Sequence, residues 1–151
     1  MKLEVGFSTG KGFAPLSWVI RQEMGTPYSH TYLHFPGSHL VFEANQKGVQ
    51  MIPCEKWEKS NKVIKVVSIE ITHERYQEIM AFVEANEGKP YSNWQLVVIL
   101  FNLPFDNGGK SYICSELIAR VLAPELGLTQ SKLDKMKPID IYNLVMEKYN
   151  D

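Results

Sequence analysis

The sequence has few cysteines, almost no net charge and no long apolar run. Its two cysteines, Cys54 and Cys114, cannot make the multi-disulfide framework of a small secreted domain, and no CxxC pair or Cys/His cluster has metal-ligand spacing. Sixteen basic against seventeen acidic residues argue against a nucleic-acid-binding surface. The longest apolar run, 96–101, is too short to cross a bilayer. We expect reduced thiols, no metal, no nucleic-acid partner and no integral membrane segment.

The length and composition are those of a single domain. A chain of 151 residues with 44% hydrophobic content can bury one core, so we expect one domain over 1–151. The amino terminus, from Met1 to Phe7, is too short and too charged for a signal peptide. The absence of such a signal predicts a cytoplasmic protein.

The first half of the chain has the pattern of strands. Leu3, Val5 and Phe7 alternate with polar or small residues, as in a half-buried strand. Turn-forming residues at 36–38 and 45–48 separate three further strand-like segments, which predicts an antiparallel meander. The expected strands cover 3–7, 30–35, 39–44, 48–52 and 63–71, and a short helix covers 16–24.

The second half of the chain is helical. Thr72 is a candidate N-cap, and Gly88 followed by Pro90 supplies a stop signal. Pro124 is expected to end the helix that starts near Cys114. The expected helices cover 72–88, 92–103, 114–124 and the segment from 138 onward. Strands followed by helices predict an α+β fold.

Cys114 lies where a helix starts. A thiol there interacts with the positive end of the helix dipole, which favours thiolate, the nucleophilic form. The same residue also continues an apolar stripe through Leu117, Ile118 and Val121, so burial in the core is the alternative. A catalytic interpretation therefore depends on a partner base elsewhere in the chain.

A candidate base is His30, on the strand that begins the meander. If Phe35 pairs with Leu40, Glu43 on the next strand lies diagonal to His30 on the same face. If Phe35 pairs with Ser38 instead, Glu43 lies directly opposite His30. A slip by one residue would place Glu43 on the far face. The sequence thus permits a His30–Glu43 hydrogen bond without requiring it.

Cys114, His30 and Glu43 would form a nucleophile, a base and an orienting group. A carboxylate on one ring nitrogen fixes the imidazole tautomer and leaves the other nitrogen to take a thiol proton. The alternatives are a satisfied or exposed strand histidine for His30 and a solvated edge carboxylate for Glu43.

Four segments carry a family resemblance. They are Pro27-Tyr28-Ser29-His30, Val41-Phe42-Glu43-Ala44 followed by Gly48-Val49, Gly88-Lys89-Pro90-Tyr91, and Tyr112-Ile113-Cys114-Ser115-Glu116-Leu117. Together they resemble the circularly permuted branch of the NlpC-type papain-like cysteine peptidases and amidases, which is related to lecithin:retinol acyltransferase-like proteins. The cysteine segment comes last here, whereas in the unpermuted family it precedes the histidine strand. The resemblance implies a permuted papain-like fold in which an antiparallel sheet or half-barrel packs against helices.

The resemblance also implies a role for each matching residue. Cys114, at a helix N-terminus, matches the nucleophile, His30 the base and Glu43 the polar third residue. Tyr91 matches the tyrosine that can assist the oxyanion hole in relatives, and Tyr28, two residues before His30, is a rival for that role.

Two residues depart from the family pattern. The strand after His30 is more polar than in relatives, and His34 is a second histidine on the same face. Histidines four residues apart on a strand lie roughly 13 Å apart, so joint metal ligation is not expected and we interpret His34 as a rim or surface residue. Cys54 is interpreted as a packing residue.

The expected activity is that of a cysteine hydrolase cleaving an amide or isopeptide bond through a Cys114 thioester, without metal or organic cofactor. By family analogy the bond belongs to a substrate such as a cell-wall stem peptide. A phage-encoded enzyme, or one delivered to the wall without a signal, would reconcile this substrate with a cytoplasmic origin, and an intracellular substrate would remove the difficulty. The alternatives are an acyltransferase or lipid (thio)esterase with the same triad, and a non-catalytic ligand-binding module. The expected partner is a peptide, isopeptide or acyl-lipid substrate, and the oligomeric state stays open.

Overall fold

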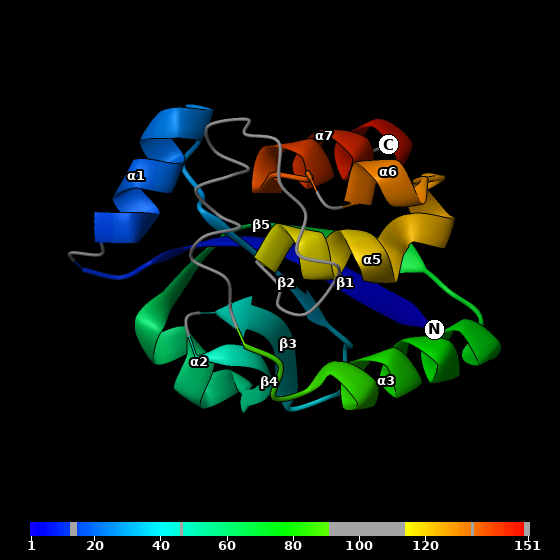
Figure 1. The fold of residues 1–151 in the computed structure, drawn as a ribbon. Coiled ribbons are helices and arrows are strands. Elements are labelled where there is room, and N and C mark those ends of the chain that lie inside the picture. The colour runs from blue at the N-terminus through cyan, green and yellow to red at the C-terminus, as the bar shows by residue number, and fades with distance from the viewer. Residues whose placement is uncertain (13–14, 46, 91–113, 134, 150–151) are drawn as a thin grey trace.

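The fold is α+β, with an open antiparallel sheet and helices around it (Figure 1). The computed structural model describes residues 1–12, 15–45, 47–90, 114–133 and 135–149. Its elements are β1 (Lys2–Gly10), α1 (Pro15–Met24), β2 (His30–His34), β3 (Leu40–Asn45), β4 (Gly48–Pro53), α2 (Cys54–Ser60), β5 (Asn61–Glu70), α3 (His73–Asn86), α5 (Cys114–Leu126), α6 (Gln130–Leu133) and α7 (Pro138–Tyr149). The helix expected over 92–103 lies outside the described residues.

Within the described residues the sheet has five strands in the order β4-β3-β2-β1-β5, and all neighbours are antiparallel. The predicted meander of β2, β3 and β4 is therefore confirmed. Leu33 pairs with Phe42 and His34 with Val41. This register is the one that continues to a Phe35–Leu40 pair, so the alternative pairing of Phe35 with Ser38 is wrong.

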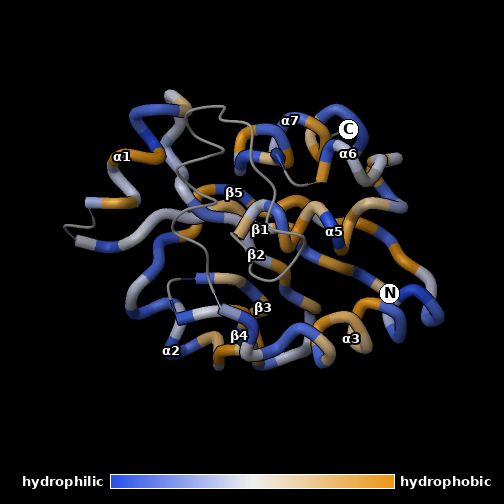
Figure 2. Tube along the Cα trace, in the orientation of Figure 1, coloured by the Kyte–Doolittle hydropathy of each residue, from blue (hydrophilic) through white to orange (hydrophobic). Residues whose placement is uncertain are grey.

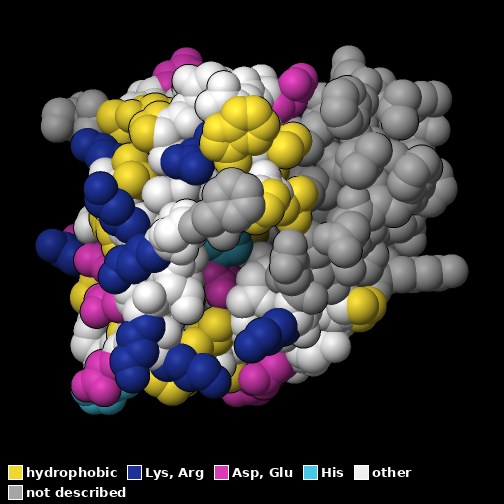
Figure 3. Space-filling view, turned by 90° about the vertical axis from the view of Figure 1, so that its left-hand side faces the viewer, with side chains coloured by type: hydrophobic (Ala, Val, Ile, Leu, Met, Phe, Trp, Pro, Cys, Tyr) yellow, Lys and Arg dark blue, Asp and Glu magenta, His cyan; other side chains and the backbone are white. Residues whose placement is uncertain are grey.

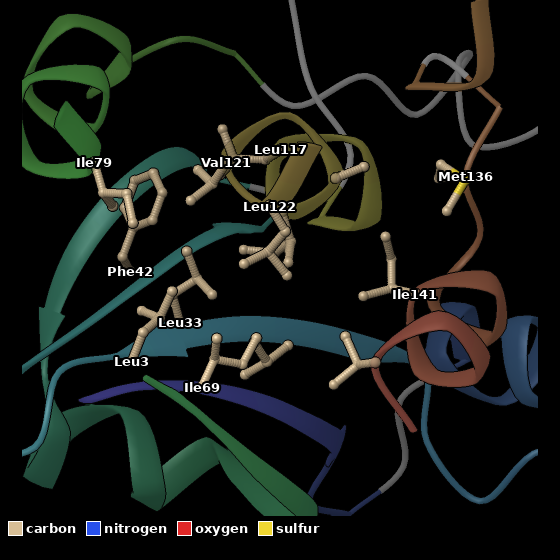
Figure 4. Packing of buried hydrophobic residues seen from close by; sticks show 14 of the residues in the cluster. Leu3, Leu33, Phe42, Ile69, Ile79, Leu117, Val121, Leu122, Met136 and Ile141 are labelled. Atoms are coloured by element: carbon tan, nitrogen blue, oxygen red, sulfur yellow. The ribbon is translucent and has the colours of Figure 1, made fainter. Parts of the chain in front are cut away.

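One face of the sheet carries the main hydrophobic core. Alternate residues of the strands, such as Val5, Leu33 and Phe42, are buried there against α5 and α7. Figure 4 shows Leu117 and Leu122 of α5 among these strand side chains, and Figure 2 shows the apolar character of α5 next to the sheet. Burial of this face fixes the position of α5, and with it the position of its first residue.

The opposite face of the sheet carries a smaller cluster under α2. Tyr32 and Val41 are buried there with Trp57 of α2, and the rings of Tyr32 and Trp57 lie 4.4 Å apart between centroids. Tyr32 fits because its strand neighbour is Gly6, where a Cβ atom would come within 2.0 Å of the Tyr32 ring. The helix α2 was not predicted, since only one of its seven residues is buried.

The ends of two helices follow local capping rules. Thr72 caps α3 by accepting a hydrogen bond from the backbone N–H of Arg75, as predicted. The expected end of α5 at Pro124 is wrong, because this helix continues to Leu126. Gly127 then adopts a φ of 64°, and the Leu128 N–H bonds to the carbonyl of Ala123, which is a Schellman-type end. Pro124 lies inside this helix, two residues before its end, and has no backbone N–H to donate to the carbonyl four residues earlier.

Candidate active site

His30 and Glu43 lie side by side on neighbouring strands. Nε2 of His30 is 2.5 Å from Oε2 of Glu43. The Glu43 side chain is only 2% exposed and that of His30 16%. The register makes the two residues diagonal neighbours on one face, which is the first of the two arrangements permitted by the sequence. The predicted contact between His30 and Glu43 is thus present.

The Glu43 carboxylate is held by two further donors. The indole Nε1 of Trp57 donates to Oε2 over 2.7 Å, and Nδ2 of Asn45 donates to Oε1 over 2.7 Å. Sequence reasoning missed both residues. Asn45 shares the strand face of Glu43 by its spacing of two, which was a usable signal, whereas nothing in the charged segment around Trp57 indicated that its indole would reach the site.

The charges of this pair stabilise each other. Burial alone would lower the pKa of His30, but the charges of Glu43 and then Cys114, together with hydrogen bonds to both side chains, raise this pKa to about 10. Burial alone would raise the pKa of Glu43, but the charge of His30 and the hydrogen bonds from His30, Trp57 and Asn45 hold it below its usual value of 4.5. At neutral pH the pair is an imidazolium and a carboxylate.

Cys114 is the first residue of α5 and is 4% exposed. Its side chain lies close enough to the His30 ring to contribute to the raised pKa of His30, through charge and through side-chain hydrogen bonding. Since Nε2 of His30 faces Glu43, Nδ1 is the ring nitrogen that remains for the thiol. The next residue, Ser115, donates its hydroxyl to the carbonyl of Met136 over 2.6 Å, which anchors the first turn of α5 to the segment before α7. The structure therefore brings Cys114, His30 and Glu43 together.

A pocket of about 590 Å³ opens beside His30. It lies between α1, the β3–β4 hairpin and α2. Figure 3 shows this face of the molecule, with histidine and acidic side chains deep in a hollow, hydrophobic side chains above them and basic ones beside and below. Its described lining residues are Gly10, Pro15, Leu16, Ser17, Ile20, Ser29, His30, Glu43, Asn45, Lys47, Gln50, Met51, Ile52, Pro53, Lys56, Trp57, Ser60 and Asn61. The volume is in the range of small-molecule sites, roughly 300–1,000 Å³.

Of the two candidate tyrosines, only Tyr28 lies within the described residues. Tyr91 lies outside the described residues. The residues just before it lie beside β4: Val49 donates its N–H to the Lys89 carbonyl, and Gly88 donates its N–H to the Val49 carbonyl. Tyr28 is 4% exposed and packs against the rings of Phe7 and Tyr142. It does not line the pocket beside His30.

The second histidine and the second cysteine have other surroundings. Nδ1 of His34 is 2.8 Å from Oε2 of Glu4, and its Nε2 is 3.0 Å from the Ser38 carbonyl. Both ring nitrogens of His34 are thus occupied, and the residue is partly buried instead of lying on the open surface. Cys54 packs partly against the cluster of Tyr32, Val41 and Trp57, in keeping with the packing role expected for it.

Among the residues that the structure describes, no group of three or more His, Cys, Asp or Glu side chains is arranged to hold a metal ion. No helix among them has the length and apolar character needed to span a membrane.

Comparison with protein-family models and with curated proteins gave no match to this chain. The site is therefore interpreted from its own geometry.

Proposed function

We propose that the protein is a cysteine hydrolase that cleaves an amide or isopeptide bond, with Cys114 as nucleophile, His30 as base and acid, and Glu43 as the group that orients His30. One observation carries the proposal: the His30 ring lies between a buried carboxylate and a thiol at the start of a helix. This is the order of contacts that activates a nucleophile. The α+β fold and the chain order of the three residues are compatible with a permuted papain-like domain.

In the acylation step the Cys114 thiolate attacks the carbonyl carbon of the scissile bond. The imidazolium of His30 first stabilises the thiolate and then donates the Nδ1 proton to the leaving nitrogen as the C–N bond breaks. The products of this step are a free amine and a thioester on Cys114. Glu43 stays ionised throughout and holds the ring through Nε2.

In the deacylation step water takes the place of the amine. Nδ1 of His30, now neutral, accepts a proton from the water as its oxygen attacks the thioester carbonyl. The C–S bond then breaks, which releases a carboxylic acid and returns Cys114 as thiolate beside the imidazolium. In both steps we assign the backbone N–H of Cys114, at the positive end of α5, to the developing oxyanion, with Tyr91 as the second candidate donor.

The pocket lining bears on the choice between peptide and lipid substrates. Hydroxyl and amide side chains line the pocket together with apolar ones, and they offer hydrogen bonds that a peptide can use and a hydrocarbon chain cannot. The polar lining residues are Ser17, Ser29, Asn45, Gln50, Ser60 and Asn61. The acyltransferase or lipid (thio)esterase reading and the non-catalytic module remain the alternatives to be tested.

The experiment is a panel of peptide, isopeptide and lipid-ester substrates, run on the wild type and on Cys114→Ala, with His34→Ala as the matched histidine control. We expect amide cleavage by the wild type and by His34→Ala, its loss in Cys114→Ala, and a transient acyl adduct on Cys114 by intact mass. Amide cleavage that persists in Cys114→Ala would contradict the proposal. A lasting adduct formed only from lipid esters would assign the lipid alternative.

A further inference from the structure

The pocket beside His30 carries positive charge. Among its described lining residues the charged ones are His30, Glu43, Lys47 and Lys56. The charges of His30 and Glu43 cancel in their ion pair. Lys47 and Lys56 are exposed, and within the described ranges neither is paired with a carboxylate. These two lysines, the basic rim from here on, therefore set the charge that a ligand meets in the part of the pocket described.

The basic rim is built on the same elements that fix Glu43. Lys47 lies in the β3–β4 turn, where its backbone N–H donates to Oδ1 of Asn45 over 2.8 Å, and Asn45 in turn donates to Glu43. Lys56 lies on α2, directly before Trp57, whose indole donates to the other oxygen of Glu43. The backbone of each lysine is thus held one contact away from the catalytic pair, while its ammonium group is free to meet solvent or ligand.

We propose that the basic rim binds a carboxylate on the acyl donor, so that the substrate of the Cys114 site is an acidic peptide; this inference rests on the proposed function. The lysines act as mobile point charges that complement an anion without a fixed bidentate geometry. Glu55 and Glu58, the carboxylates nearest to Lys56 in the sequence, are not among the lining residues of the pocket.

The whole molecule does not attract anions, because its net charge is −1. A preference for anionic over neutral ligands must therefore come from the local electric field of the basic rim. Both lysines are exposed, so the effect is screened by salt and is largest at low ionic strength. A preference for an anionic ligand that weakens as salt is added is the expected signature.

A matched pair of reagents tests the proposal. N-bromoacetyl-aspartate α-amide and N-bromoacetyl-asparagine α-amide have nearly the same shape and differ by one carboxylate, and both alkylate a reactive thiol with loss of bromide. At low ionic strength the alkylation rate of Cys114 by the aspartate reagent, divided by its rate with the asparagine reagent, should be about fivefold to tenfold lower in Lys47→Gln/Lys56→Gln than in the wild type. Lys132→Gln on α6, away from the pocket, is the control and should keep the wild-type ratio. An equal ratio in wild type and double variant would overturn the proposal.

A binding measurement separates this inference from the proposed function. In Cys114→Ala, which cannot react, N-acetyl-aspartate α-amide should shift the Trp57 indole N–H resonance at a lower concentration than N-acetyl-asparagine α-amide. The difference should disappear in Cys114→Ala/Lys47→Gln/Lys56→Gln. If the difference between the two ligands remains in this triple variant, the basic rim does not bind the carboxylate, whatever the reactivity of Cys114. Suppression of both shifts by anionic phospholipid vesicles, and not by neutral ones, would overturn the assignment to a peptide.

Discussion

Trp57 donates its indole N–H to Oε2 of Glu43, the same oxygen that faces the His30 ring. Trp57 is 3% exposed and packs at a tilt against the ring of Tyr32, so the direction of its indole is fixed by packing. A carboxylate with one oxygen held by two donors cannot rotate away from the histidine without losing both bonds. Trp57 is therefore a positioning residue: it acts on the proposed chemistry through Glu43.

The first prediction concerns Trp57→Phe, which keeps an aromatic ring in the cluster and removes the donor. The hydrogen bond from Trp57 helps to hold the pKa of Glu43 low. We expect the acidic limb of the pH–rate profile to move to higher pH, and the free energy of unfolding to fall by about 1–3 kcal/mol. Trp18→Phe on α1, where the side chain is 55% exposed, is the matched control. An unchanged acidic limb would limit Trp57 to a packing role.

The second prediction concerns Gly6→Ala. The added Cβ would lie 2.0 Å from Cζ of Tyr32, so the ring must move and disturb its tilted contact with Trp57. We expect a loss of about 1–3 kcal/mol in the free energy of unfolding, measured by denaturant titration. If the clash is the cause, Tyr32→Ala combined with Gly6→Ala costs less than the sum of the two single changes. Strictly additive losses would refute this account of Gly6.

The third prediction follows from the direction of the two pKa shifts. The pKa of His30 rises from 6.5 to about 10 on folding, so its contribution to stability is complete below 6.5 and is lost as pH rises toward 10. The pKa of Glu43 is lowered from 4.5, so its contribution is present above 4.5 and is lost as pH falls. The difference in free energy of unfolding between wild type and His30→Gln should therefore shrink as pH rises from 6.5 to about 10. Denaturant titrations at each pH measure this difference. A difference that grows over this interval would show that His30 is not held as an imidazolium.

Much of the site was predictable because strand geometry is regular. The alternation of the β2 and β3 residues placed His30 and Glu43 on one face in two of the registers considered, and one of these is observed. The sequence did not choose between the two, because registers that differ by two residues place the same side chains on the same face of each strand. In the structure Leu33 lies opposite Phe42 within the core.

Other features were not predictable for specific physical reasons. The helix α2 is short and mostly charged, so it shows no helical period, and its one buried side chain, Trp57, is placed by tertiary contact with Tyr32. Pro124 signalled a helix end that in fact comes two residues later, at Leu126, where Gly127 with its φ of 64° supplies the left-handed residue that closes the helix. His34 was expected at the rim, and its partner Glu4 lies 30 residues away on β1.

The central claim is that Cys114 is an activated nucleophile, and one measurement tests it most directly. Native protein is treated with limiting iodoacetamide at mildly acidic pH, and the alkylation rates of Cys114 and Cys54 are compared by peptide mass analysis. We predict that Cys114 reacts about tenfold faster than Cys54. We also predict that His30→Ala abolishes this advantage and that His34→Ala preserves it. Equal rates at the two cysteines, or an advantage of Cys114 that survives His30→Ala, would contradict the account.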